Sequence, residues 1–66
     1  MRYKVILNHS RENYLFWKTA RSKVAAVNFA RLSLERKLGL RKGALACEFD
    51  GKKNNITVEV EREEVL

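Results

Sequence analysis

The chain has 66 residues, with 14 Lys or Arg against eight Asp or Glu, a formal net charge of +6 and 45% apolar residues. This length allows a single small domain over residues 1–66, which buries only about 60% of the surface of its unfolded form. One cysteine and one histidine provide neither a disulfide nor a metal cluster, and no apolar run is long enough to cross a membrane. We therefore expect a domain that is stabilised by association, lies in the reducing cytoplasm, and uses no metal, cofactor or membrane.

The first predicted element is a short β-strand. Tyr3, Val5 and Leu7 alternate with Lys4 and Ile6, so both faces of this strand are largely apolar. A strand with two apolar faces is typical of the interior of a sheet, and we expect it to be a central strand.

The second predicted element is one long helix over residues 11–38, which contain no proline. Ser10 is a suitable N-cap, and Gly39 is placed to end the helix in a left-handed conformation. Such a helix is about 42 Å long, whereas a six-residue strand covers only about 20 Å. Half of the helix would then have no sheet to cover, unless the chain kinks within residues 19–22 and folds back.

This predicted helix has two apolar strips. The strip expected to cover the sheet consists of Phe16, Ala20, Val24, Val27, Ala30, Leu34 and Leu38. A second strip runs through the basic side of the helix, where a monomer would be expected to be polar. We expect this strip to pack against a second copy of the chain, through Tyr14, Trp17, Phe29 and Leu32.

The last predicted elements are two strands that form a C-terminal hairpin. Apolar residues recur at every second position in 45–49 and again in 56–60, and the intervening residues 50–55 are rich in turn formers. The predicted order is therefore β-α-β-β, an α+β fold. One long helix packs on one face of a three-stranded mixed sheet, with the first strand parallel to one strand of the hairpin.

The sequence contains no convincing catalytic constellation. Cys47 and His9 could form a nucleophilic pair, but the spacing of Cys47 from Leu45 and Phe49 favours a small core residue. The glycines and cations of residues 39–43 resemble a phosphate-binding loop only in composition, because they follow a helix and lack the Lys-Ser/Thr step. We expect a protein that is not an enzyme.

The distribution of charge indicates a polyanionic partner. Residues 11–42 carry nine basic and two acidic side chains. We predict a small basic nucleic-acid-binding protein, acting as a homodimer, that uses a Lys/Arg-rich helix face. The predicted contacts are Arg11, Lys18, Arg21, Arg36, Lys37, Arg41 and Lys42. Glu59 and Glu61 on the last strand would repel phosphates, so the helix side is expected to be the binding side.

A protein-interaction module is the alternative prediction. A small adaptor or inhibitor would dock on a protein partner by its long helix or by the edge strand at residues 56–60, without any role in nucleic-acid binding. Binding of nucleic acid that weakens with salt would separate the two hypotheses.

Overall fold

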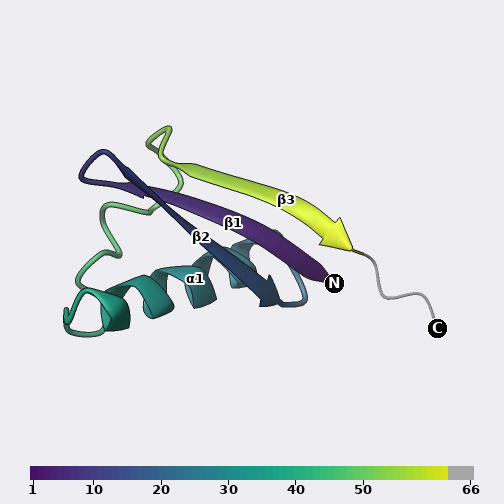
Figure 1. The fold of residues 1–66 in the computed structure, drawn as a ribbon, viewed down its shortest axis with the longest axis horizontal. Coiled ribbons are helices and arrows are strands. Elements are labelled where there is room, and N and C mark those ends of the chain that lie inside the picture. Colours follow the sequence, from purple (N-terminus) through teal and green to yellow (C-terminus); the bar gives the residue numbers. More distant parts are fainter. Residues whose placement is uncertain (63–66) are drawn as a thin grey trace.

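The computed structural model describes the backbone of residues 1–62 and the side chains of residues 1–60. Four elements follow one another along this part of the chain: β1 (Arg2–His9), β2 (Glu12–Thr19), α1 (Lys23–Lys37) and β3 (Ile56–Arg62) (Figure 1). The α+β class is confirmed. The predicted order β-α-β-β is wrong, because the helix is preceded by two strands and followed by one.

The segment that was expected to begin the long helix is instead β2, which forms a hairpin with β1. Val5 lies opposite Phe16, and the two strands are joined by a two-residue turn at Ser10 and Arg11. Both turn residues have positive φ, 51° and 69°, as the tight type I′ hairpin turn requires. This turn usually carries Asn or Gly, so the common sequence signal of a hairpin is missing here. Ser10 is therefore a turn residue and not a helix cap.

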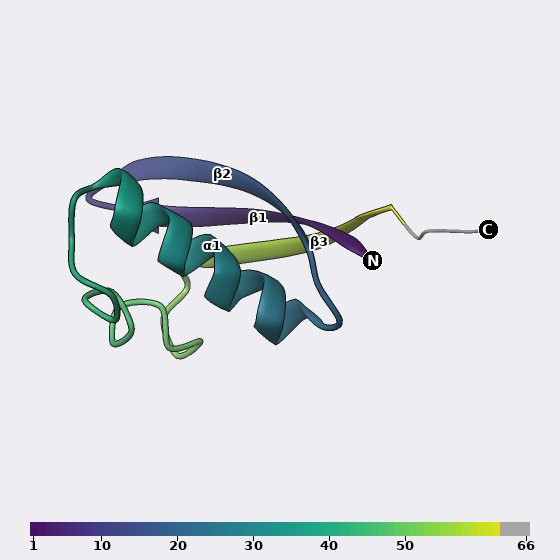
Figure 2. The ribbon, with the colours of Figure 1, turned by 90° about the horizontal axis from the view of Figure 1, so that it is seen from below.

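The three strands form one antiparallel sheet in the order β2-β1-β3. The central position of β1 is confirmed, whereas the prediction of a mixed sheet with a parallel pair is wrong. Tyr3, Val5 and Leu7 of β1 are buried on the face that α1 covers, which we call the helix face (Figure 2). The residues between them lie on the opposite side of the sheet, which no element of the described chain covers and which we call the open face.

Helix α1 begins where the chain leaves β2. The Ser22 hydroxyl accepts a hydrogen bond from the Ala25 N–H (3.2 Å) and caps the first turn. The chain thus reverses within residues 19–22, where the sequence permitted a break, although a strand and not a helix precedes the reversal. At the other end Gly39 has φ +71° and, with Leu40, closes a Schellman motif on the last turn. The predicted end of the helix is confirmed.

The helix has 15 residues and a length of about 22 Å, similar to that of the strands beside it. The overhang expected from a 28-residue helix does not exist. No helix in the described residues has the length and apolar character needed to span a membrane.

Small side chains let the helix lie close to the sheet. Ala26, Ala30 and Leu34 are fully buried, and they belong to one core cluster with the three buried residues of β1. Val27 and Leu38 of the predicted sheet-covering strip also pack on this core. The prediction that Val24 covers the sheet is wrong, because this residue is 72% exposed.

Residues 41–51 form a series of turns beside the helix, where a strand had been predicted at 45–49. Leu45 and Phe49 are both buried, and the Phe49 N–H donates to the Leu45 carbonyl (3.0 Å). This is the i, i+4 spacing of a single helical turn, and it leaves Cys47 exposed between them. The predicted C-terminal hairpin is therefore wrong, and so is the prediction that Cys47 is a core residue. The segment closes the core on the β3 side of α1 (Figure 2).

Candidate nucleic-acid interface

Five of the seven predicted phosphate contacts come from segments that lie at one end of the molecule. Arg11 is at the tip of the β1–β2 turn, Arg36 and Lys37 are in the last turn of α1, and Arg41 and Lys42 follow that helix. The turn and the C-terminal end of the helix lie at the same end of the fold in both views (Figures 1 and 2). We call Arg11, Arg36, Lys37, Arg41 and Lys42 the basic end.

Two contacts connect the parts of this group. The Lys37 ammonium lies 5.8 Å from the centre of the Tyr14 ring, which links the helix to β2 three residues after Arg11. Arg36 and Lys42 line a common hollow of about 290 Å³, together with Leu32, Glu35 and Leu40. Leu32 and Leu40 offer an apolar surface beside these cations, which suits the sugar and the phosphate of a phosphodiester, and the Glu35 carboxylate also lines the hollow.

The cations of the basic end have no salt-bridge partner among the described side chains. Within residues 1–60, whose side chains the structure describes, no salt bridge joins any of the five to an acidic group. Arg36 and Lys37 also have a structural role, because cations in the last turn favour the negative end of the helix dipole. This role does not apply to Arg11, Arg41 or Lys42, which lie outside the helix.

Arg11 occupies a strained position. Its φ of 69° is in the left-handed region, which costs a non-glycine residue about 1 to 2 kcal/mol. Glycine or asparagine would fit this turn better on steric grounds. Strain of this kind is concentrated at functional positions, and here it places a cation at the exposed tip of a hairpin.

The other two predicted contacts lie elsewhere. Lys18 is on the helix face of β2, where its ammonium donates to the Ser33 hydroxyl (2.6 Å) and lies 5.8 Å from the centre of the Phe16 ring. Arg21 is in the connection between β2 and α1, at the opposite end of the molecule from Arg11 (Figure 1). The prediction that these cations share one face of a helix is therefore wrong, since Arg11, Lys18 and Arg21 are not on a helix.

The predicted interface strip is also divided. Tyr14 packs on the core from β2, and its hydroxyl donates to Glu12 (2.9 Å). That hydrogen bond, with desolvation and the negative charge of Glu12, raises the pKa of Tyr14. Trp17 is on the open face of the sheet and is 45% exposed. Phe29 and Leu32 alone lie on the outer side of α1, where Phe29 is 47% exposed.

Glu35 is the residue that the sequence analysis missed. Its carboxylate is buried, with 1% of the residue exposed, and accepts hydrogen bonds from the Gly43 N–H (2.9 Å), the Leu45 N–H (2.8 Å) and the Arg31 guanidinium (2.7 Å). Burial alone would raise the pKa of Glu35, but the three hydrogen bonds and the charge of Arg31 together lower it. Glu35 thus anchors the segment that carries Lys42 to the helix that carries Arg36.

A second anchor holds the same segment to the β1–β2 hairpin. The His9 Nδ1 lies 2.6 Å from the Glu48 carboxylate, and the Asn55 amide donates to the Glu48 carbonyl (2.8 Å). His9 therefore pairs with Glu48 and not with Cys47. Both anchors fix the position of residues 41–48 relative to the strained turn at Arg11, so the basic end is held by the fold.

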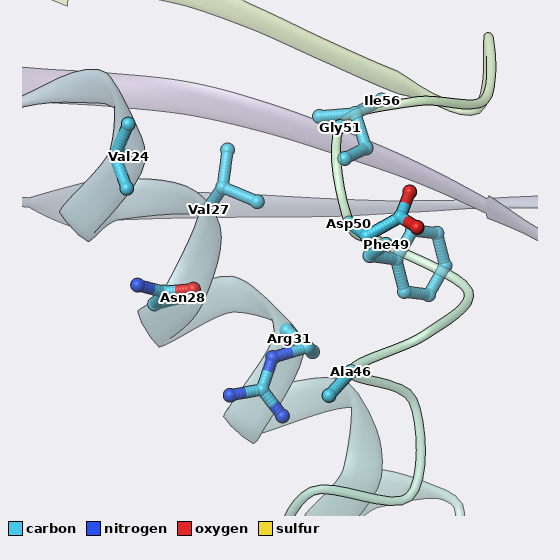
Figure 3. A pocket seen from close by; sticks show the side chains of 9 residues that line it. All are labelled: Val24, Val27, Asn28, Arg31, Ala46, Phe49, Asp50, Gly51 and Ile56. Atoms are coloured by element: carbon cyan, nitrogen blue, oxygen red, sulfur yellow. The ribbon is translucent and has the colours of Figure 1, made fainter.

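An apolar groove lies between α1 and residues 46–51 (Figure 3). It has a volume of about 310 Å³, and Figure 3 shows the side chains that surround it. The lining residues are Val24, Val27, Asn28, Arg31, Ala46, Phe49, Asp50, Gly51 and Ile56. The groove is mostly apolar and does not adjoin the cations of the basic end, so it is a separate feature of the surface.

Comparison of the chain with known proteins finds no match among protein-family models, curated proteins or solved structures.

Proposed function

We propose that the protein binds nucleic acid and that the basic end contacts the phosphate backbone. The observation that carries this proposal is the gathering, at one end of a molecule with net charge +6, of five cations that form no salt bridge within residues 1–60. Cations brought together from a turn, a helix end and a loop create a local positive potential that attracts a polyanion. The exposed single cysteine suits a reducing compartment, so the proposal includes a cytoplasmic location.

A change of two charges at the basic end tests this proposal. Arg41→Ala with Lys42→Ala is expected to weaken binding of labelled DNA and RNA by about tenfold or more at low salt, because two phosphate contacts are lost. The slope of log K against log salt should become less steep by about 0.7 to 0.9 for each lost contact. Fluorescence anisotropy over a range of salt concentrations measures both quantities.

The matched control removes the same net charge at the opposite end. Arg21→Ala with Lys23→Ala also eliminates two exposed cations, but these precede or begin α1. We expect a much smaller loss of affinity. Equal losses for the two double variants would mean that only net charge matters, and the absence of binding at low salt by the unchanged protein would refute the proposed function.

The strained turn provides a test in which stability and binding change in opposite directions. Arg11→Gly is expected to raise the free energy of unfolding by up to about 1 kcal/mol, because glycine adopts positive φ without strain. The gain is reduced by the greater entropy that glycine gives to the unfolded chain. The same variant should bind nucleic acid several-fold more weakly. Thermal unfolding and anisotropy on one preparation measure the two effects, and unchanged affinity would remove Arg11 from the interface.

A protein-interaction module remains the second candidate, and the groove between α1 and residues 46–51 favours it. Phe29 and Val24 are also exposed apolar side chains on the helix. A self-associating protein would use such surfaces to form the homodimer expected from the sequence. Light scattering after size-exclusion chromatography measures the mass, and a salt-independent dimer that does not bind nucleic acid would favour this candidate.

A further inference from the structure

The open face of the sheet carries an uncovered strip in which aromatic, apolar, amide and basic side chains are adjacent. Lys4 lies directly opposite Trp17, Ile6 opposite Leu15, and Asn8 opposite Asn13. Directly opposed residues have Cβ atoms only about 4.5 to 5.5 Å apart, so these pairs form one continuous surface. We call these six residues the open-face strip.

The large apolar side chains of this strip are exposed to solvent. Trp17 and Leu15 are each close to half exposed, although they are among the largest apolar side chains of the chain. The open face is covered by no helix and no loop of the described residues. A flat aromatic ring on a rigid strand, with a cation beside it, is the arrangement on which unpaired bases stack.

The charges on the β1–β2 half of the open face favour binding of a polyanion. Arg2 and Lys4 are the charged residues of that half, and both are basic. Glu59 lies on β3, on the far side of Lys4 from Trp17. Lys4 therefore lies between Glu59 and Trp17. A polyanion that lies along β2 does not contact Glu59.

The strip leads toward the basic end. Trp17, Leu15 and Asn13 are on the same side of β2, and the strand leads to Arg11 at the turn, about 20 Å from Trp17. The acidic Glu12 lies between Asn13 and Arg11, but its carboxylate accepts from the Tyr14 hydroxyl on the helix-face side of the strand. The Asn8 amide donates to the Asn13 carbonyl oxygen (2.9 Å). This bond leaves the Asn13 amide nitrogen and the Asn8 carbonyl oxygen available to the edges of bases.

We propose that the open-face strip is a stacking platform for single-stranded nucleic acid, with bases on Trp17 and Leu15 and the backbone directed toward Arg11. This inference rests on the proposed function and specifies its substrate class. A duplex keeps its bases paired and stacked, so it reaches the basic end with its phosphates but gains nothing from Trp17. A second copy of the chain is a poorer occupant, because two molecules of charge +6 repel each other and Lys4 would be desolvated in the contact.

Trp17 is the only tryptophan in the chain, so its fluorescence reports directly on this face. We expect single-stranded DNA or RNA of about ten nucleotides to quench the emission, whereas a blunt duplex of the same sequence leaves it unchanged. In anisotropy measurements Trp17→Ala should bind the single strand about 5- to 100-fold more weakly, with duplex affinity unchanged, and Trp17→Phe should retain most of the binding.

Phe29→Ala is the matched control, since Phe29 is an aromatic residue of nearly equal exposure on the outer side of α1. Its single-strand affinity should equal that of the unchanged protein. Thermal unfolding of each variant establishes that it is folded, and the quenching experiment needs no variant at all.

Three results would overturn the inference. Equal affinity for single strand and duplex without quenching would leave nucleic-acid binding by the basic end intact and remove the platform. A change of molecular mass caused by Trp17→Ala would assign the strip to a second copy. Failure of both nucleic acids to bind at low salt would refute the proposed function, and the platform with it.

Discussion

Replacement of Phe49 by alanine is expected to lower the free energy of unfolding by about 3 to 5 kcal/mol. Phe49 is only 5% exposed and belongs to the core cluster, although it comes from a segment of turns and not from a helix or strand. A domain of this size has a total stability of roughly 3 to 10 kcal/mol, so this variant should be largely unfolded at or a little above room temperature. Urea and thermal unfolding followed by circular dichroism measure the loss.

Phe29→Ala is again the matched control, because the same atoms are removed from a side chain that is 47% exposed. Its effect should be within about 0.5 kcal/mol of zero, as for most surface substitutions. Similar effects at Phe49 and Phe29 would show that residues 41–51 do not contribute to the core. A loss at Phe29 that depends on protein concentration would instead support the homodimer, in which this side chain is buried.

Replacement of Glu35 by glutamine is expected to lower the melting temperature by on the order of 10 °C at neutral pH. The carboxylate receives two backbone N–H groups and the Arg31 guanidinium. Glutamine has one acceptor oxygen and an amide group that is itself a donor, so these donors would be left unsatisfied in a buried site. Hydrogen exchange should show loss of protection at the Gly43 and Leu45 amides, because they are the donors.

The same residue predicts a dependence of stability on pH. Desolvation raises the pKa of Glu35, but its hydrogen bonds and the charge of Arg31 bring the pKa in the folded protein below the ordinary value of 4.5. A lowered pKa adds stability that is fully present above about pH 4.5 and is lost as the pH falls below it. The melting temperature of the unchanged protein should therefore decrease more between pH 7 and pH 3 than that of Glu35→Gln.

Glu59→Gln is the control for this experiment, because Glu59 is an exposed carboxylate on β3. Its melting temperature should follow the same pH dependence as the unchanged protein. Parallel curves for Glu35→Gln and the unchanged protein would show that the buried carboxylate does not contribute in this range. In that case residues 41–51 would be held mainly by Leu45 and Phe49.

Binding at the basic end depends on the Glu35 anchor, whereas the open-face strip does not. Lys42 and Arg36 share a hollow with Glu35, which holds residues 43–45 against the helix. Glu35→Gln should therefore also weaken binding at the basic end, whereas stacking on Trp17 should persist as long as the hairpin is folded. Glu35→Gln therefore distinguishes the contribution of the basic end to binding from that of the open-face strip.

The local sequence determined three features of the fold. The apolar residues on both sides of β1 predicted a central strand, alternation at residues 56–60 predicted β3, and Gly39 predicted the end of the helix. Each of these signals depends on neighbouring residues alone. A residue with positive φ, or a period of two bounded by turn formers, constrains the backbone wherever the segment lies in the fold.

The tertiary structure decided the identity of β2 and of residues 45–49. The segment Glu12–Thr19 has apolar residues on both sides and fits either a strand or a helix, and its Ser10-Arg11 turn lacks the usual glycine. Pairing with β1 selects the strand. The backbone of residues 12–19 then forms its hydrogen bonds with β1, and the side chains on the helix face of the sheet are buried against α1. Leu45 and Phe49 fit a period of two as well as a helical turn, and burial against α1 selects the turn.

The charges were predictable from the sequence, but their grouping was not. The excess of cations in residues 11–42 indicated a polyanionic partner before the fold was known. Which cations share a surface depends on the reversals at residues 10–11 and 19–22, which place Arg11 near one end of α1 and Arg21 near the other. Glu35 and Trp17 received their environments in the same way. The Glu35 carboxylate accepts hydrogen bonds from amides eight and ten residues away, and the Trp17 indole is left exposed because α1 packs on the opposite face of the sheet.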